Sequence, residues 1–424
     1  MTAPPEVVII GAGVAGLTAA RELSAAGVRV LVLEARDRLG GRVMTHHAPE
    51  GPVELGAEFV HGAFSETMGV VEEAGLRLRE VGSRTGRTPG RGRRRDLPNF
   101  FGAMDALLAR ALTGAPDESF QQLVDRIDVA PEIKAQALSL VQGYHAADPA
   151  RMSVQSLIRN TAADERPGAE RQFRFADGYD NLVEAMFQRI DPKLCDVERN
   201  AVVTAVEWQA KRVRMQTSAG REYTAPRAIV TVPLGVLKAG AIRFTPALDG
   251  KERALRTLEM GAVLRVSLCL EDDVWAAQDG LSPDEFLFTG DPPFPVWWVS
   301  RPPPFPVVTG WAAGPNARAL AGRSEAERVR VAVDALPRVL EMDPVQLQKG
   351  LRGGFSHDWQ IDPFSRGAYS YAAVGGSAAG EELGAPLDST LFFAGEATES
   401  DGRNATVHGA IASAQRVARE VLRS

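Results

Sequence analysis

The stretch EVVIIGAGVAGLTAARELSAAGVRVLVLEARDRLGGR, residues 6–42, decides the fold. It opens with Val7–Ile10, a continuous run of β-branched residues that is typical of a strand buried on both faces of a parallel sheet. A glycine-rich turn and a helical segment follow, and Val28–Leu33 is predicted as the second strand, with Glu34 at its end. This order of strand, turn, helix and strand predicts a complete βαβ unit.

The turn after the first strand has the spacing GxGxxG. Gly11 permits the tight turn, Gly13 lets the backbone approach a pyrophosphate, and Gly16 lets the helix pack close to the strand. The helix N-terminus offers free N–H groups and the positive end of a dipole to phosphates. Glu34 lies 18 residues after Gly16, where a carboxylate can accept hydrogen bonds from a ribose diol and would repel a 2′-phosphate. The unit is therefore predicted to bind a dinucleotide.

The composition is typical of a soluble globular protein. The chain has 424 residues, is 45% hydrophobic and 24% charged, and carries a net charge of −6, which excludes a global attraction to nucleic acid or to an anionic membrane. No apolar run approaches the ~20 residues that cross a bilayer, and no signal peptide is evident. Cys195 and Cys269 form no CxxC pair, so we expect reduced thiols and a cytoplasmic protein. The Arg-rich loop 84–95 is interpreted as a solvated insertion, with an anion-binding patch as the alternative.

Motifs along nearly the whole chain resemble those of the flavin-containing amine oxidases, a family that includes monoamine oxidases, polyamine oxidases and lysine-specific histone demethylases. The motifs are IIGAGVAGLTAARELSAAGVRVLVLEARDRLGGRV (9–43), ELGAEFVHG (54–62), TVPLGVLK (231–238), DWQIDPFSRGAYSY (358–371) and FFAGEATE…ATVHGA (392–410). The likeness is closest to the polyamine oxidases. The length leaves no room for the tower insertion and extra domain of the demethylases.

This resemblance implies FAD as the cofactor and assigns its contacts. At the nucleotide end they are the first glycines and Glu34, then Arg36, Gly40, Gly41 and Arg42 around the pyrophosphate, and Val202 at the adenine. Along the flavin they are Gly56 and Ala57, where the backbone passes it, Trp359 beside the ring, and Gly395 and Glu396 at the ribityl–phosphate. The backbone of Thr406 and Val407 would lie at the pyrimidine end of the ring system. A helix N-terminus there would favour the negative charge that reduction builds. Covalent monoamine oxidases bear a cysteine where this chain has Ala368, so the resemblance implies non-covalent FAD.

The resemblance also implies four residues on the substrate side. Tyr369 matches one wall of an aromatic cage, and Thr406 matches the other, as in polyamine oxidases and demethylases. His61 matches a histidine that could steer or deprotonate an amine, with a structural histidine as the alternative. Arg265 stands where the family usually has a lysine that holds a water against flavin N5. An arginine could anchor that water, bind a carboxylate of the substrate or the protein, or form a purely structural pair.

The order of apolar patterns predicts an α/β fold in which a Rossmann-like FAD-binding domain is discontinuous and an α+β substrate domain is inserted into it. Residues 100–190 are largely helical in period, residues 197–232 return to strands, and a strand and a nucleotide-type helix follow residue 352. The FAD-binding segments are 1–75, 190–242 and 352–424, and the substrate-domain segments are 76–189 and 243–351.

As function, the resemblance implies oxidation of a primary or secondary amine, a polyamine or a monoamine, to an imine. Hydride would pass to flavin N5, and O2 would be reduced to H2O2. The alternatives are an L-amino-acid oxidase, a desaturase-type flavoprotein that acts on a C–C bond, and a non-catalytic flavin-binding protein. The expected partners are the small-molecule amine and O2, with neither nucleic acid nor membrane.

Overall fold

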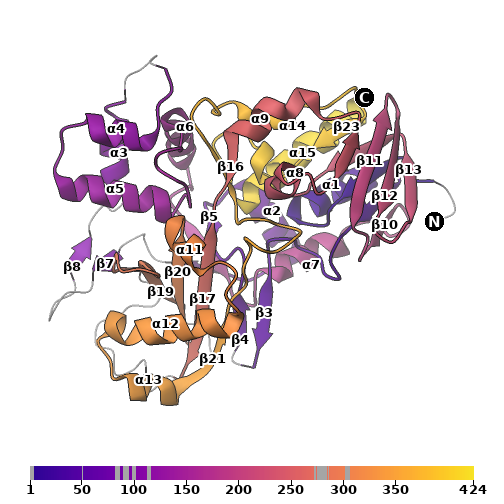
Figure 1. Cartoon of the computed structure of the whole chain (residues 1–424). Coiled ribbons are helices and arrows are strands. Elements are labelled where there is room, and N and C mark those ends of the chain that lie inside the picture. Colours follow the sequence, from indigo (N-terminus) through magenta and orange to yellow (C-terminus); the bar gives the residue numbers. More distant parts are fainter. Residues whose placement is uncertain are drawn as a thin grey trace.

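The computed structural model of the chain describes most of its residues (Figure 1). The described residues are 4–49, 51–81, 86–88, 95–97, 102–111, 116–271, 274, 284, 286–300 and 306–424. The Arg-rich loop 84–95 lies outside them, except where it enters the short strands β7 (Gly86–Thr88) and β8 (Arg95–Leu97).

A five-stranded parallel sheet joins strands from distant parts of the chain. Its order is β10 (Cys195–Glu198), β2 (Val30–Leu33), β1 (Val7–Ile10), β14 (Arg227–Val230) and β23 (Leu391–Phe393). In the central strand β1, Val7 and Ile9 face one apolar cluster, whereas Val8 and Ile10 face another. A strand that is buried on both faces needs an unbroken apolar run, which is why its sequence does not alternate.

Two different layers cover the faces of this sheet (Figure 1). One face packs against the helices α1 (Val14–Ala25), α2 (Ser65–Ala74), α7 (Asp180–Gln188) and α15 (Val407–Arg423). The other face packs against a four-stranded sheet in the order β13 (Glu222–Ala225), β12 (Arg212–Thr217), β11 (Val203–Gln209) and β15 (Arg243–Thr245). The predicted α/β fold of Rossmann type is confirmed.

The second large sheet has seven strands and lies beside the first in Figure 1. Its order is β21 (Leu351–Phe355), β17 (Val263–Leu270), β20 (Val307–Ala313), β19 (Val296–Ser300), β18 (Phe286–Phe288), β7 and β8. The helices α11 (Pro315–Leu320), α12 (Glu325–Leu340) and α13 (Pro344–Gly350) share an apolar core with this sheet. A separate helical group has its own core and consists of α3 (Gly102–Leu108), α4 (Phe120–Arg126), α5 (Pro131–Gly143) and α6 (Val154–Asp164).

Shorter elements connect these parts. Three small sheets lie among the described residues. The first pairs β3 (Thr45–Ala48) with β4 (Gly51–Glu54), and the second pairs β16 (Leu258–Met260) with β22 (Ser370–Ala372). The third has the order β5 (Val60–His61), β9 (Gln172–Phe175) and β6 (Leu78–Val81). Other helices that the structure describes are α8 (Leu234–Lys238), η1 (Asp249–Lys251), α9 (Glu252–Thr257), α14 (Ala379–Gly384) and η2 (Glu396–Thr398). Within the described part of the chain, no helix combines the length and the apolar character that spanning a bilayer requires.

Candidate active site

A cavity of about 560 Å3 connects the two large sheets. One end is lined by residues at the carboxyl ends of β1 and β2, and the other end by side chains of β17, β18, β19 and β20. Every residue that the sequence singled out for the cofactor or the substrate lines this cavity except Gly16. Ligands of α/β proteins bind at the carboxyl ends of the strands, so the position is the expected one for a bound dinucleotide.

Glycines from two separate motifs form a cradle at the first end of the cavity. Gly13 and Gly40 form a parallel β-bridge, and a Cβ on Gly41 would lie 3.3 Å from the Gly13 Cα. Helix α1 begins directly after Gly13 and carries no side-chain cap and no acidic residue in its first turn. Backbone that is free of side chains, next to an uncapped helix N-terminus, fits the pyrophosphate of a dinucleotide.

Charged side chains surround the cradle, and each already has protein partners. Glu34 at the end of β2 accepts hydrogen bonds from the N–H groups of Ala12 (2.6 Å) and Arg36 (2.8 Å). Arg36 donates from Nη2 to Asp362 Oδ1 at 2.7 Å. Arg42 donates from Nη1 to the carbonyl oxygen of Ala368 at 2.6 Å and to Glu396 Oε1 at 2.9 Å, which links the start of the chain to its last motif.

The last motif forms a turn that begins helix α15 at the cavity. Glu396 Oε2 accepts from Ser370 Oγ at 2.6 Å and from the Ala405 N–H at 3.0 Å. Thr406 is the N-cap of α15: its hydroxyl accepts from the Gly409 N–H at 3.0 Å and donates to the Arg403 carbonyl at 2.6 Å. This capping contact was not foreseen from the sequence, although a threonine before a run of small residues is a known cap signal.

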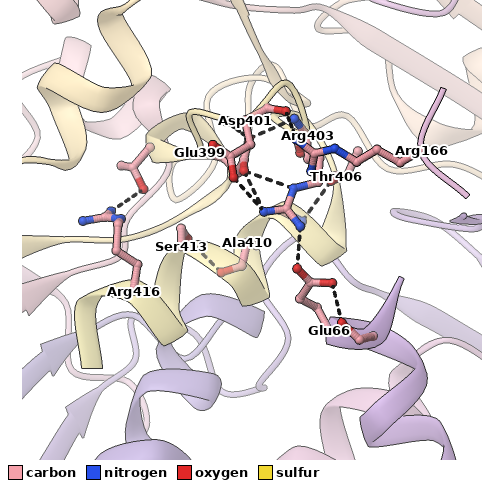
Figure 2. A network of polar contacts seen from close by, with 12 residues as sticks. Glu66, Arg166, Glu399, Asp401, Arg403, Thr406, Ala410, Ser413 and Arg416 are labelled. Atoms are coloured by element: carbon pink, nitrogen blue, oxygen red, sulfur yellow. Dashed lines mark hydrogen bonds and ion pairs between the residues drawn. The ribbon is translucent and has the colours of Figure 1, made fainter. Parts of the chain in front are cut away.

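Figure 2 shows that Arg403 fixes this turn. Its guanidinium lies between Glu399 (Nη2 to Oε1, 3.1 Å) and Glu66 of helix α2. Glu399 Oε2 also accepts from the N–H groups of Asp401 (2.9 Å) and Arg403 (2.8 Å). Because Arg403 and Glu399 are mostly buried, these contacts tie the loop before α15 to the neighbouring helix.

His408 lies in the first turn of α15, with its ring 4.5 Å from that of Phe64. Burial, and then the charge of Arg403, lower the pKa of His408 to about 3. In the unfolded chain a histidine has a pKa of ~6.5. Above that pH both states are neutral, and below it only the unfolded chain binds the proton, so stability falls as the pH falls toward about 3.

When the pH is lowered from about 7 to about 5, protonation of this histidine in the unfolded chain should decrease the free energy of unfolding by about 2 kcal/mol. The slope approaches ~1.4 kcal/mol per pH unit only below the unfolded-state pKa of ~6.5. Urea unfolding of the wild type and of His408→Gln at both pH values measures this decrease, and the variant should lose correspondingly less stability. The same substitution at the exposed His46 is the control. An equal loss in wild type and His408→Gln would contradict the assignment.

At the other end of the cavity, Arg265 is paired with a carboxylate of the protein. On β17, Leu264, Val266 and Leu268 face the helix-covered core, so the alternating Arg265 faces the other way. Arg265 is 3% exposed, and its Nη2 lies 2.6 Å from Glu58 Oε2. This outcome is one of the possibilities that the sequence left open.

Glu58 is the centre of a charge cluster, which we define as Arg79, Arg174, Arg265, Glu58 and Asp284; Arg79 is 38% exposed and the other four side chains are at most 7% exposed. Arg174 lies 2.8 Å from Glu58 Oε1 and 2.8 Å from Asp284 Oδ1, and Arg79 pairs with Asp284. Burial alone would raise the pKa of Glu58, but the charges of Arg174 and Arg265 and a hydrogen bond from Trp298 outweigh it and lower this pKa. Glu58 is therefore ionised, and it contacts both arginines.

Aromatic and imidazole side chains complete this end of the cavity. The Tyr369 hydroxyl donates to the Tyr144 carbonyl at 2.8 Å, which fixes the ring that the sequence predicted as a cage wall. The His61 ring is 6.0 Å from that of Tyr144, in an edge-to-face arrangement. The neighbouring His145 also lines the cavity, and burial lowers its pKa to about 4, so its imidazole is neutral at physiological pH. Trp359 is 4% exposed and donates from Nε1 to the Leu55 carbonyl at 2.8 Å.

Several cavity residues were missed from the sequence. Glu58, Tyr144 and His145 belong to this group, together with Trp298 and Trp311. The sequence held a usable signal only for Glu58. Arg265 stands in an otherwise mostly apolar strand, and a buried arginine needs an acid nearby. Among the described residues, no group of three histidine, cysteine or acidic side chains is placed to hold a metal ion.

The fold and the cavity define a dinucleotide-binding α/β protein with a second compartment beside the nucleotide cradle. The chain belongs to the flavin containing amine oxidoreductase family, which matches residues 14–422. Membership implies a flavin cofactor and an oxidoreductase, as the motifs predicted.

Named relatives agree with this assignment. Polyamine oxidase 4 of Oryza sativa subsp. japonica is 29% identical over 452 residues, covering 97% of this chain and 87% of that protein. Lysine-specific histone demethylase 1 homolog 3 of Arabidopsis thaliana is 28% identical over 98% of this chain, which spans only 30% of the demethylase. Two solved structures share the fold at 22% identity: putrescine oxidase with bound putrescine (TM-score 0.82, all of both chains) and cyclohexylamine oxidase from Brevibacterium oxydans IH-35A (TM-score 0.81, 99% of both).

Proposed function

We propose that the protein is an FAD-dependent amine oxidase that converts a primary or secondary amine to an imine and uses O2 as the electron acceptor. The observation that carries this proposal is the single cavity that joins the glycine cradle to Tyr369 and Arg265, in a chain of this family. A bound FAD would supply the redox chemistry, accepting hydride from the α-carbon of the amine and passing the electrons to O2 to give H2O2.

The residues around the cradle suit this cofactor. We propose that Gly11, Gly13, Gly40 and Gly41 bring backbone to the pyrophosphate and that Glu34 accepts from a ribose. The other proposed contacts are Arg36 and Arg42 at the phosphates, Val202 at the adenine, Gly56, Ala57 and Trp359 along the flavin, Gly395 and Glu396 at the ribityl chain, and Thr406 and Val407 at the N-terminus of α15. The helix N-terminus there favours negative charge on the reduced ring.

On the substrate side, the side chains orient the amine and exclude water. The Tyr369 ring, held by the Tyr144 carbonyl, presents a fixed aromatic face to the substrate. The neutral imidazole of His145 can accept a hydrogen bond from the amine, and His61, beside Tyr144, is the proposed group that accepts its proton. Arg265 is held by Glu58, so we propose that it positions the wall of the cavity and binds no substrate carboxylate.

We also propose that the FAD is bound without a covalent bond. Ala368 offers no nucleophile, and the two cysteines, Cys195 and Cys269, do not line the cavity. Acid precipitation of the purified protein should therefore release all of the flavin into the supernatant. A yellow, flavin-bearing pellet after washing would contradict this prediction.

The function is tested by mixing the protein anaerobically with amines and following the visible absorbance of the flavin. We expect bleaching by an amine but not by L-amino acids. Only the neutral amine can lose hydride easily, and a free alkyl amine has a pKa of ~10.4. The reduction rate at low amine concentration should therefore rise close to tenfold per pH unit from about pH 6 to about pH 9. A flat pH profile, or bleaching by dithionite only, would refute amine oxidation.

A further inference from the structure

We propose that the substrate is a hydrophobic monoamine with an aryl or cycloalkyl body, and that diamines and polyamines are rejected. The inference rests on the proposed amine oxidation and specifies its substrate. It is drawn from the aromatic lining of the substrate end of the cavity and from the charges that lie directly behind that lining.

Five aromatic residues form one continuous surface, which we call the aromatic wall: Phe59, Phe286, Phe288, Trp298 and Trp311. Neighbouring rings of this wall have centroids 5.5–6.3 Å apart, for example 5.5 Å between Trp298 and Trp311 and 6.3 Å between Phe286 and Phe288. Such spacings are those of tilted and stacked aromatic pairs, and another apolar ring can join them in the same way. The wall therefore fits the apolar body of an amine.

An aromatic face can also attract a second ammonium group, but two rings of the wall already bind cations. The Arg174 guanidinium lies 4.5 Å from the centroid of the Phe59 ring, and that of Arg265 lies 5.7 Å from the Trp298 ring. Both arginines belong to the charge cluster, in which Glu58 and Asp284 balance these two buried arginines, whereas the third arginine, Arg79, is 38% exposed. A second ammonium would therefore meet two rings that already face cations, and it would find no unpaired acid among the buried members of the cluster.

The acids that line the cavity are also engaged. Among the described lining residues they are Glu34, Glu58 and Glu396. Glu58 contacts two arginines, Glu396 contacts Arg42 and Ser370, and Glu34 lies at the cradle, where backbone N–H groups occupy it. A second ammonium would thus be buried without a carboxylate partner, which is unfavourable.

The test compares hexylamine with hexane-1,6-diamine, which differ only in the terminal group, by anaerobic flavin reduction. We expect the ratio of reduction rate to dissociation constant to be at least 100-fold higher for hexylamine, and 2-phenylethylamine to be at least as good as hexylamine. Equal or better reduction by the diamine or by spermidine would overturn the proposal.

Binding is measured separately with amines that have no α-hydrogen and so cannot be oxidised. This measurement distinguishes a failure of amine oxidation from a failure of the proposed ligand preference. Calorimetry should show binding of 2-phenylpropan-2-amine and none of 2,5-dimethylhexane-2,5-diamine. If this result is found but no amine bleaches the flavin, amine oxidation is refuted and the preferred ligand class stands. If the diamine binds as tightly, the preferred class is refuted.

A pair of variants tests whether the aromatic wall determines the preference for monoamines over diamines. Phe288→Glu would add a carboxylate to the wall, and Phe288→Gln is its uncharged control. The ratio of diamine to monoamine reduction should be at least tenfold higher in the glutamate variant than in the glutamine variant. Identical ratios in the two folded variants would show that the far end of the substrate does not meet this wall.

Discussion

Gly16→Ala is expected to yield protein that lacks bound flavin and is less stable by about 3 kcal/mol, at the upper end of what overpacking usually costs. A Cβ on Gly16 would lie 1.9 Å from the Gly11 carbonyl oxygen and 3.2 Å from Thr231 Oγ1. The closer neighbour is backbone, so helix α1 must move away from the turn after β1. That movement opens the cradle in which the pyrophosphate would be held. The flavin-to-protein absorbance ratio and the thermal midpoint measure both effects.

Gly69→Ala is the matched control, because it makes the same change in a helix with open space around the new Cβ. Alanine is a better helix former than glycine, so this variant should keep its flavin and gain up to ~1 kcal/mol of stability. A Gly16→Ala protein that retained full flavin and an unchanged thermal midpoint would show that α1 does not depend on this close approach.

The cradle could be predicted from the sequence because its determinants are local. The apolar run of β1, the glycine spacing and Glu34 all lie within one βαβ unit, so their order already implies their arrangement. Gly40 and Gly41 follow shortly after, and their contact with Gly13 completes the same unit.

The substrate end could not be predicted in the same way, because its contacts join residues that are far apart along the chain. Glu58 meets Arg174 and Arg265 only after β9 and β17 have been placed, and nothing local links them. The wall around Trp298 and Trp311 likewise depends on the register between β19 and β20. The family resemblance assigned Thr406 to a cage wall, whereas its cap contact with Gly409 follows from helix physics that applies to any fold.

Glu58→Gln is expected to destabilise the protein by about 3–5 kcal/mol, the usual cost of removing one partner from a buried ion pair. Glu58 lies within 2.8 Å of guanidinium nitrogens of both Arg174 and Arg265, and both of these side chains are at most 6% exposed. A glutamine can still accept a hydrogen bond from Trp298, but it leaves the buried Arg265 without its carboxylate, whereas Arg174 keeps its pairing with Asp284. Urea unfolding at neutral pH, under conditions that keep the flavin bound, measures the change.

Glu80→Gln is the control, since Glu80 also pairs with an arginine, Arg171, but both of these side chains are about half exposed (50% and 46%). Solvent screens such a pair, so this variant should unfold almost as the wild type does. Adding Arg265→Met to Glu58→Gln removes the buried charge that has lost its carboxylate partner and should recover roughly 1–2 kcal/mol of stability. If the double variant were instead less stable than Glu58→Gln, Arg265 would be held by contacts other than its pairing with Glu58, and the cluster would not be the reason why an arginine occupies this strand.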